Sequence, residues 1–373
     1  MLAVARVILP AAIVASSACF TYVNFEEGGA APGGAPAGGA GGCAVQAGGD
    51  AVCSYPLDSE EAVADGFADA LIVDGDDIFT KGLDLAEVKA RRFKLNDMTA
   101  VGELLSLGTA RADAPFLVAD NVGDRYLVAA LGKQDCLQSG AETCIRRFEI
   151  LESDFGMSGG IKFQGSVEQI DALAKTDLAV YFAVAPADGG AQVRRAPADC
   201  VLGAANKTCT TQLVASVDTG PVTALSARYV SATDTTSLYF ITEDCAYFHP
   251  DAEMPGMPSC KGGAWTGLAA NDEVGFLGNS QGVDRFGDQG PVAVPGLEGF
   301  GAPIAVDGNV VYATGGSQVV AYDAANDMRL ATLSLPPGSD VLALDASDST
   351  WVVLLLSYGV DRKLHRWRKP EPL

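Results

Sequence analysis

The sequence predicts an all-β protein folded as a β-propeller of about seven blades, with six or eight blades as alternatives. Three observations favour this fold. Short strands rich in β-branched and aromatic residues alternate with polar or glycine-containing turns after residue 65. These strand pairs return at intervals of 36 to 58 residues, and a propeller blade takes roughly 40 to 50 residues. Helical periodicity is scarce, and only residues 83–95 and 167–174 are ambiguous.

Seven hairpins are expected, each with a first strand, a turn and a second strand that ends in a large apolar or basic residue. The expected strand pairs are 71–73 with 78–79, 126–128 with 145–148, 180–182 with 193–195, 238–240 with 247–248, 274–276 with 283–286, 310–312 with 319–322 and 351–353 with 364–367. The intervals are measured between one residue of each hairpin, and these residues are taken as equivalent: Val73, Tyr126, Tyr181, Tyr239, Phe276, Tyr312 and Val353. A large β-sandwich or two smaller β domains is the alternative, because short alternating strands occur there too.

The first 18 residues have the pattern of an export signal that is removed from the mature protein. Arg6 is the only charge before residue 26, and Val7–Ser17 is an apolar run too short to cross a bilayer. Small residues, Ser16–Ala18, precede Cys19. This segment resembles a bacterial lipobox, although Ser16 stands where such boxes favour leucine. The resemblance implies a lipid on Cys19, and a secreted protein with one free thiol is the alternative.

Residues 19–42 are expected to form a lipid-anchored, flexible tether. Gly28–Gly42 contains only Gly, Ala and Pro, which cannot bury enough apolar surface to fold. A flexible coil from Phe20 to Gly42 spans on the order of 25 Å, enough to hold a domain clear of a membrane. Residues 43–65 are interpreted as a cysteine-stapled lead-in and residues 66–373 as the propeller. Phe20 follows Cys19. In lipoproteins with a similar signal, a residue other than Asp at this position favours the outer membrane.

Nine cysteines leave eight for disulfides once Cys19 carries a lipid. In an exported chain these eight are expected to pair with their sequence neighbours, although eight cysteines allow about 105 pairings. The expected couples are Cys43/Cys53, Cys136/Cys144, Cys200/Cys209 and Cys245/Cys260. No couple has the C-x-x-C spacing of a zinc ribbon, a redox site or a haem attachment, so no metal or other cofactor is expected.

The charge balance argues against nucleic-acid binding. Lys and Arg number 25 against 47 Asp and Glu, and the formal charge of −22 repels phosphate backbones. Five basic residues gather near the C-terminus: Arg362, Lys363, Arg366, Arg368 and Lys369. Their alternation with Leu364 and Trp367 predicts an edge strand whose charges deter pairing with other chains. Docking of an acidic partner is the alternative.

No catalytic constellation stands out. Residues 278–282 (GNSQG) match the G-x-S-x-G pattern of hydrolases, with Asp361 and His365 downstream. The next residues continue as a strand rather than a helix, so we expect a hairpin turn in which Gly278 and Asn279 adopt positive φ. Only two histidines are present, His249 and His365, which leaves little general-base capacity near neutral pH.

Asp74, Asp76 and Asp77 provide hard oxygen ligands that would suit calcium. Their spacing is not that of an EF-hand loop. A solvated turn is therefore the favoured interpretation of this acidic run.

Residues 319–333 (VVAYDAANDMRLATL) resemble the A-x-D-x-x-T-G repeat of quinoprotein-like and WD40-like bacterial β-propellers, with Ala321, Asp323 and Ala324 in register. Asp327 stands where the family has Gly, and the resemblance covers about one blade. It implies the architecture but not a quinone cofactor. The plan of lipobox, glycine-rich stalk and propeller is similar to that of bacterial envelope lipoproteins, including outer-membrane assembly factors.

Together these patterns predict a non-catalytic cell-envelope lipoprotein that acts as a protein-binding or scaffold module. Its expected location is the outer membrane, with secretion as the alternative. Its expected partners are the membrane, through the N-terminal lipid, and an envelope protein, but no nucleic acid. The alternative function is a hydrolase or lyase acting on extracellular glycans or peptides, with carboxylates contributed by several blades.

Overall fold

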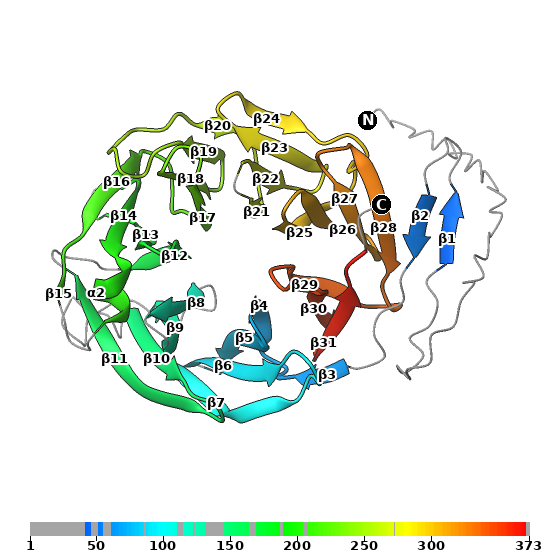
Figure 1. Cartoon of the computed structure of the whole chain (residues 1–373), viewed down its shortest axis with the longest axis horizontal. Coiled ribbons are helices and arrows are strands. Elements are labelled where there is room, and N and C mark those ends of the chain that lie inside the picture. Colours follow the sequence, from blue (N-terminus) through cyan, green and yellow to red (C-terminus); the bar gives the residue numbers. More distant parts are fainter. Residues whose placement is uncertain are drawn as a thin grey trace, which may run out of the picture.

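The computed structural model shows a ring of seven β-sheets, which confirms the predicted all-β class and number of blades (Figure 1). It describes residues 42–45, 51–54, 61–85, 87–109, 115–121, 124–130, 145–163, 169–186, 189–203, 208–271 and 273–370. Within these residues the single helix is α2 (Ala198–Leu202). In the same part of the chain, no helix has the length and apolar composition needed to cross a membrane.

Each blade is an antiparallel sheet of four main strands, ordered from the ring axis outward. Blade 1 contains β4 (Ala68–Asp74), β5 (Asp77–Asp84), β6 (Glu87–Lys94) and β7 (Ala100–Thr109). Blade 2 contains β8 (Phe116–Asn121), β9 (Asp124–Ala130), β10 (Ile145–Ile150) and β11 (Phe155–Phe163). Blades 3 and 4 contain β12 (Ile170–Lys175), β13 (Ala179–Val184), β14 (Ala191–Pro197), β16 (Gln212–Val217), and β17 (Ala224–Val230), β18 (Thr235–Ile241), β19 (Cys245–His249), β20 (Lys261–Gly262).

The remaining blades follow the same plan. Blades 5 and 6 contain β21 (Gly267–Ala270), β22 (Gly275–Gly278), β23 (Val283–Gly287), β24 (Gly290–Ala293), and β25 (Gly301–Asp307), β26 (Val310–Gly315), β27 (Gln318–Asp323), β28 (Met328–Ser334). Blade 7 contains β29 (Asp340–Asp345), β30 (Trp351–Tyr358), β31 (Asp361–Arg368) and β3 (Glu61–Ala64). Three short strands lie outside the blades: β1 (Gly42–Val45), β2 (Ala51–Ser54) and β15 (Thr208–Cys209).

The hydrophobic core lies between neighbouring blades, because every blade packs both faces. The middle strand β13 is buried along its whole length, as expected for a strand covered on both sides. Between blades 6 and 7, Tyr312 and Trp367 meet edge to face with ring centres 6.0 Å apart. Burying each such side chain contributes roughly 1.5–3 kcal/mol.

All seven predicted hairpins are present, but the first occupies a different position in its blade from the other six. Six of them join the second and third strands of a blade, whereas the first joins β4 and β5, the first and second strands. Val73 is therefore not equivalent to the other six residues. Strand β4 resembles a second strand in sequence because Leu71 and Val73 pack against Val353 and Leu355 of blade 7. The described parts of the two ambiguous segments fold mainly into strands, in β5 and β6 and in β12.

Strand β3 closes the ring by pairing antiparallel with β31, from Glu61 opposite His365 to Ala64 opposite Arg362. The prediction that the C-terminal basic residues form an edge strand is therefore wrong, because β31 lies between β30 and β3. The blades begin at residue 61 rather than 66, because a segment preceding the first blade supplies the outer strand of the last one.

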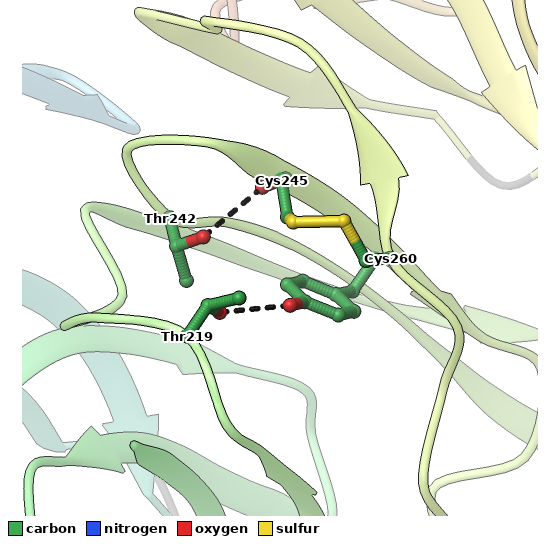
Figure 2. The surroundings of a disulfide bond; sticks show 5 residues. Thr219, Thr242, Cys245 and Cys260 are labelled. Carbon is green, nitrogen blue, oxygen red and sulfur yellow. Dashed lines mark hydrogen bonds between the residues drawn. A yellow bond between two sulfur atoms is a disulfide. The ribbon is translucent and has the colours of Figure 1, made fainter. Parts of the chain in front are cut away.

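Two of the expected cysteine couples are disulfides in the structure, Cys200–Cys209 and Cys245–Cys260. Figure 2 shows the second of them. Cys43 and Cys53 lie directly opposite each other in the β1–β2 ladder. Cys19, Cys136 and Cys144, the signal peptide and most of the tether lie outside the described residues.

Candidate functional site

A cavity of about 600 Å³ opens among the inner strands of blades 1 to 4. Its lining comes from the beginnings of β4, β8, β12 and β17 with the residues just before β8 and β17, so it lies at one end of the ring axis. Most of the wall is apolar and includes Leu71, Ile72, Phe116, Leu173 and Leu225. We call this space the channel-mouth cavity.

Two buried charged residues line the channel-mouth cavity. Lys81 is 4% exposed, and its ammonium lies 5.5 Å from the ring centre of Phe116. Asp171 is 6% exposed and accepts a hydrogen bond of 2.6 Å from the side-chain amide of Gln169. Charged groups are costly to bury. Their presence in an apolar, concave wall is typical of a binding site, which combines apolar surface with a few placed polar groups.

The GNSQG segment forms the turn between β22 and β23, as expected, but not by positive φ. Neither Gly278 nor Asn279 has a positive φ. The Asn279 side chain instead accepts hydrogen bonds from the backbone N–H groups of Gln281 (2.7 Å) and Gly282 (3.1 Å). This side-chain turn replaces the left-handed conformation.

Ser280 of this turn lines a second cavity of about 520 Å³, formed by blades 5 to 7 at the same end of the ring as the channel-mouth cavity. Its walls are small and polar, with Thr266, Thr314 and Asp340 beside several glycines. Ser280 lies in blade 5, whereas His365 lies in blade 7. Neither His365 nor Asp361 lines this cavity, so the cavity does not bring the serine, histidine and aspartate of the G-x-S-x-G pattern together.

The two histidines are buried in separate blades. His249 ends β19, is 6% exposed and accepts a hydrogen bond at Nδ1 from the N–H of Asp251 (3.4 Å). Burial lowers the pKa of His249, so its ring is neutral at pH 7. His365 in β31 has its Nε2 3.3 Å from the hydroxyl of Tyr358.

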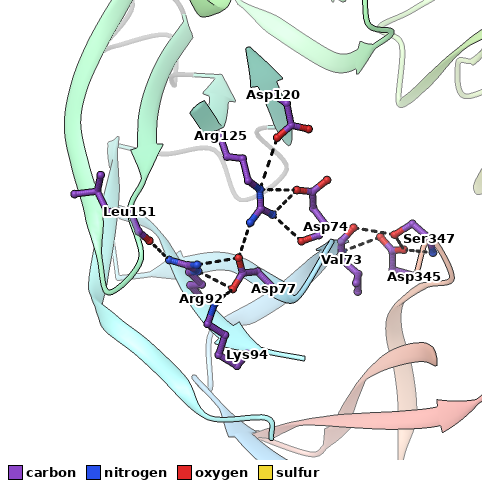
Figure 3. Close-up of polar contacts among 10 residues, drawn as sticks. All are labelled: Val73, Asp74, Asp77, Arg92, Lys94, Asp120, Arg125, Leu151, Asp345 and Ser347. Carbon is purple, nitrogen blue, oxygen red and sulfur yellow. Dashed lines mark hydrogen bonds and ion pairs between the residues drawn. The ribbon is translucent and has the colours of Figure 1, made fainter. Parts of the chain in front are cut away.

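In the acidic run at the β4–β5 turn, Asp76 is exposed, as expected of a solvated turn, whereas Asp74 and Asp77 take part in an ion network (Figure 3). Asp77 is fully buried, and Arg92 binds both of its carboxylate oxygens, with distances of 2.9 Å from Nε and 2.8 Å from Nη2. Lys94 adds a bond of 2.9 Å and Arg125 one of 2.8 Å. Three cations thus saturate the carboxylate of Asp77, one of the three possible calcium ligands.

Arg125 joins this network to blade 2. It contacts the Asp74 carboxylate and donates to the Asp74 carbonyl over 2.7 Å. Burial acts to raise the pKa of Asp77, but hydrogen bonds from Arg92, Lys94 and Arg125 outweigh it and hold the pKa below its usual value. Among the described residues, no group of three or more His, Cys, Asp or Glu side chains is placed to hold a metal ion.

A second polar contact joins the last blade to the first. Asp345 of β29 accepts a hydrogen bond of 3.0 Å from the N–H of Val73, and the Ser347 hydroxyl lies 2.6 Å from the Asp345 carboxylate and 2.8 Å from the Val73 carbonyl. Burial raises the pKa of Asp345, although these hydrogen bonds oppose the rise. No sequence pattern indicates this contact or the partners of Asp77, because the residues involved lie far apart in the chain.

The comparisons with known proteins agree with the fold. The sequence matches no protein-family pattern and no curated protein. The structure is similar to the WD40 domain of Pan2 from Neurospora crassa, with a TM-score of 0.54 and 11% identity over 83% of this chain and 90% of that one. It is also similar to the WD40 β-propeller domain of Doa1, with a TM-score of 0.54 and 13% identity over 84% of this chain and 97% of that one. Such low identity establishes a WD40-like propeller fold alone.

Proposed function

We propose that this chain is a non-catalytic protein-binding or scaffold module of the cell envelope, and that its partner docks over the channel-mouth cavity. The cavity carries the proposal: it combines apolar walls with the buried charges of Lys81 and Asp171 at one end of a rigid ring. Its volume of about 600 Å³ lies within the usual 300–1,000 Å³ of ligand sites. A few side chains of a partner protein would fill it.

A photo-crosslinking amino acid placed in the exported chain tests this docking site. Leu225 lines the channel-mouth cavity, whereas Asn309 lines a smaller cavity formed by blades 4 to 7. Asn309 belongs to the β25–β26 turn, at the opposite end of the ring. We expect an envelope protein to crosslink to position 225 and not to position 309. Crosslinking at 309 alone would place docking elsewhere, and no crosslink at any surface position would contradict a binding role.

The proposed membrane anchor is an N-terminal lipid on Cys19, at the start of the tether of residues 19–42. It is supported by the apolar signal before Cys19 and by the Gly, Ala and Pro composition after it. Mass spectrometry of the mature N-terminus should find a diacylated or triacylated Cys19. An unmodified Cys19 or a retained signal would end the lipoprotein proposal and leave the secreted alternative.

An enzyme on the same scaffold is the competing function. An activity screen against glycans and peptides with the wild-type chain and Asp171→Asn tests it, because Asp171 is a carboxylate placed in the cavity wall. The proposal expects no turnover. Turnover that Asp171→Asn abolishes would replace it with a hydrolase or lyase.

A further inference from the structure

Two strands outside the blades and one loop of blade 4 lie along the outer edges of blades 2, 3 and 6. Strand β15 pairs with β11, Gly256 pairs with Ala215 of β16, and β2 pairs with β28. All three pairings are parallel. We call these segments edge caps, because each covers backbone groups that an outer strand would otherwise present to other chains.

The cap on β16 shows how such pairing is made. The N–H of Gly256 donates to the Val214 carbonyl over 2.9 Å, and the Gly256 carbonyl accepts from the N–H of Ser216 over 3.4 Å. The Cys245–Cys260 disulfide closes the loop that carries this cap. The Cys200–Cys209 disulfide also involves a cap, because Cys209 belongs to β15, the cap on β11. The outer strands of this propeller therefore accept an extended, parallel segment.

The capped outer strands are the long ones, with one exception. Strands β11, β16 and β28 contain 9, 6 and 7 residues and are capped. Strands β3, β20 and β24 contain 4, 2 and 4 residues and have no cap among the described residues. Strand β7 contains 10 residues, and no strand of the described chain lies beyond it (Figure 1). Within the described residues, the longest outer edge is therefore left without a cover.

The register shows that β7 directs backbone groups outward at Ser106, which lies between two register shifts of the β6–β7 ladder. Asp84 and Glu87 close the two-residue hairpin between β5 and β6, and Lys89 pairs with Gly82 further along. Hydrogen-bonded pairs recur at every second residue of an antiparallel ladder, so Lys89 turns its N–H and C=O toward β5. Ser106 of β7 is opposite Lys89 on the other side. Its N–H and C=O therefore point away from β6.

The surroundings of β7 are acidic. Glu103 is exposed on the strand, and the Glu87 carboxylate accepts a hydrogen bond from the Ser106 hydroxyl over 3.3 Å. Asp154 of blade 2 lies against Gly102, where an added Cβ would come within 2.7 Å of its Oδ1. Lys89 and Arg91 of β6 already pair with Asp84 over 2.6 Å and with Asp65 over 3.0 Å. A strand that docks here meets a surplus of negative charge.

We infer that the outer edge of β7 is a second interaction surface, which binds an extended, lysine- or arginine-containing segment of another protein as a parallel strand. Backbone pairing would follow the pattern of the three edge caps, and charge complementarity selects a basic segment. A second copy of this chain carries the same charge of −22 and is repelled. Gly28–Gly42 of the tether contains only Gly, Ala and Pro, which are poor strand formers.

A labelled peptide of eight residues that alternates Val or Thr with Lys or Arg is the probe. Fluorescence anisotropy measures its binding to the full exported chain, and hydrogen exchange maps the site. We expect binding that slows exchange of the β7 amides. The same peptide with alternate amides N-methylated should bind at least tenfold more weakly, because it cannot pair as a strand. A peptide with Glu in place of Lys and Arg should also bind at least tenfold more weakly.

Ser106→Pro and Ser106→Ala form a matched pair of variants. Proline removes the outward N–H and should weaken peptide binding at least tenfold, whereas alanine removes only the hydroxyl bond to Glu87 and should leave binding within twofold. Glu103→Lys, on an exposed side chain, should weaken binding without touching the core, and it serves if Ser106→Pro does not fold. Equal binding of the N-methylated peptide, or protection of another strand, would overturn the inference. So would slow exchange of the outward-pointing Ser106 amide before peptide is added, since the edge would then be filled by this chain or by a second copy.

Discussion

Single residues in this propeller act mainly by joining blades. Asp77 belongs to blade 1, yet one of its three cationic partners, Arg125, comes from blade 2. Arg366 of blade 7 donates to the carbonyls of Leu95 (2.6 Å) and Asn96 (2.7 Å) of blade 1 and stacks 4.6 Å from the Trp351 ring. Buried charges of this kind stabilise only when every partner is present.

Asp77→Asn should therefore destabilise the fold by about 3 kcal/mol at pH 7, because it leaves the buried guanidinium of Arg92 without its counter-charge. The pKa of Asp77 is lowered in the folded state, so its contribution is present above the unfolded pKa of about 3.9 and is lost as pH falls through the folded value. Urea unfolding should show that the free energy of unfolding differs between wild type and variant at pH 7. This difference should become smaller toward pH 3. A difference that does not change with pH would show that the Asp77 charge is not what stabilises the site.

At the scale of elements, alternating apolar residues are enough to locate one hairpin in every blade. The same local signal does not identify partners distant in sequence. Nothing in residues 61–64 indicates that they pair with β31, and nothing in the DGDD run indicates Arg92 and Arg125. The C-terminal basic residues predict an edge strand because their charges alternate with apolar residues. That pattern arises instead because Leu364 and Trp367 are buried while Arg366 bonds to blade 1.

The edge caps lead to a prediction at this scale. Replacing Cys245 and Cys260 with alanine should release the loop that carries Gly256, and the Ser216 amide, which donates to Gly256, should exchange at least tenfold faster. The amide of Val193, on β14 one strand further in, should be unchanged. Hydrogen exchange with mass spectrometry resolves the two strands. Cys200→Ala with Cys209→Ala is the matched control, since that cap lies on β11. Unchanged exchange at Ser216 would mean that the cap holds without its disulfide.

The whole molecule depends on closing the ring, because each blade packs its faces against two neighbours. Strand β3 closes it by supplying the fourth strand of the last blade from the N-terminal part of the chain. Blade 7 also contacts blade 1 through the cluster that contains Val73, Val353 and Leu364. A closed ring should unfold as one cooperative unit, whereas an opened ring should lose its terminal blades first.

Replacing Glu61–Ala64 with Pro-Gly-Pro-Gly tests closure, because proline removes strand amides and both residue types disfavour strands while the chain length is kept. We expect the midpoint of thermal unfolding to fall by several degrees and the single transition to split, with blades 1 and 7 losing exchange protection before blades 3 to 5. The same replacement of Ala51–Ser54 is the control. That segment, β2, caps blade 6 through one bridge from Cys53 to Ala331 and belongs to no blade, so the transition should stay single. If both variants unfold like the wild type, inter-blade packing alone holds the ring, and β3 serves only to cover the β31 edge.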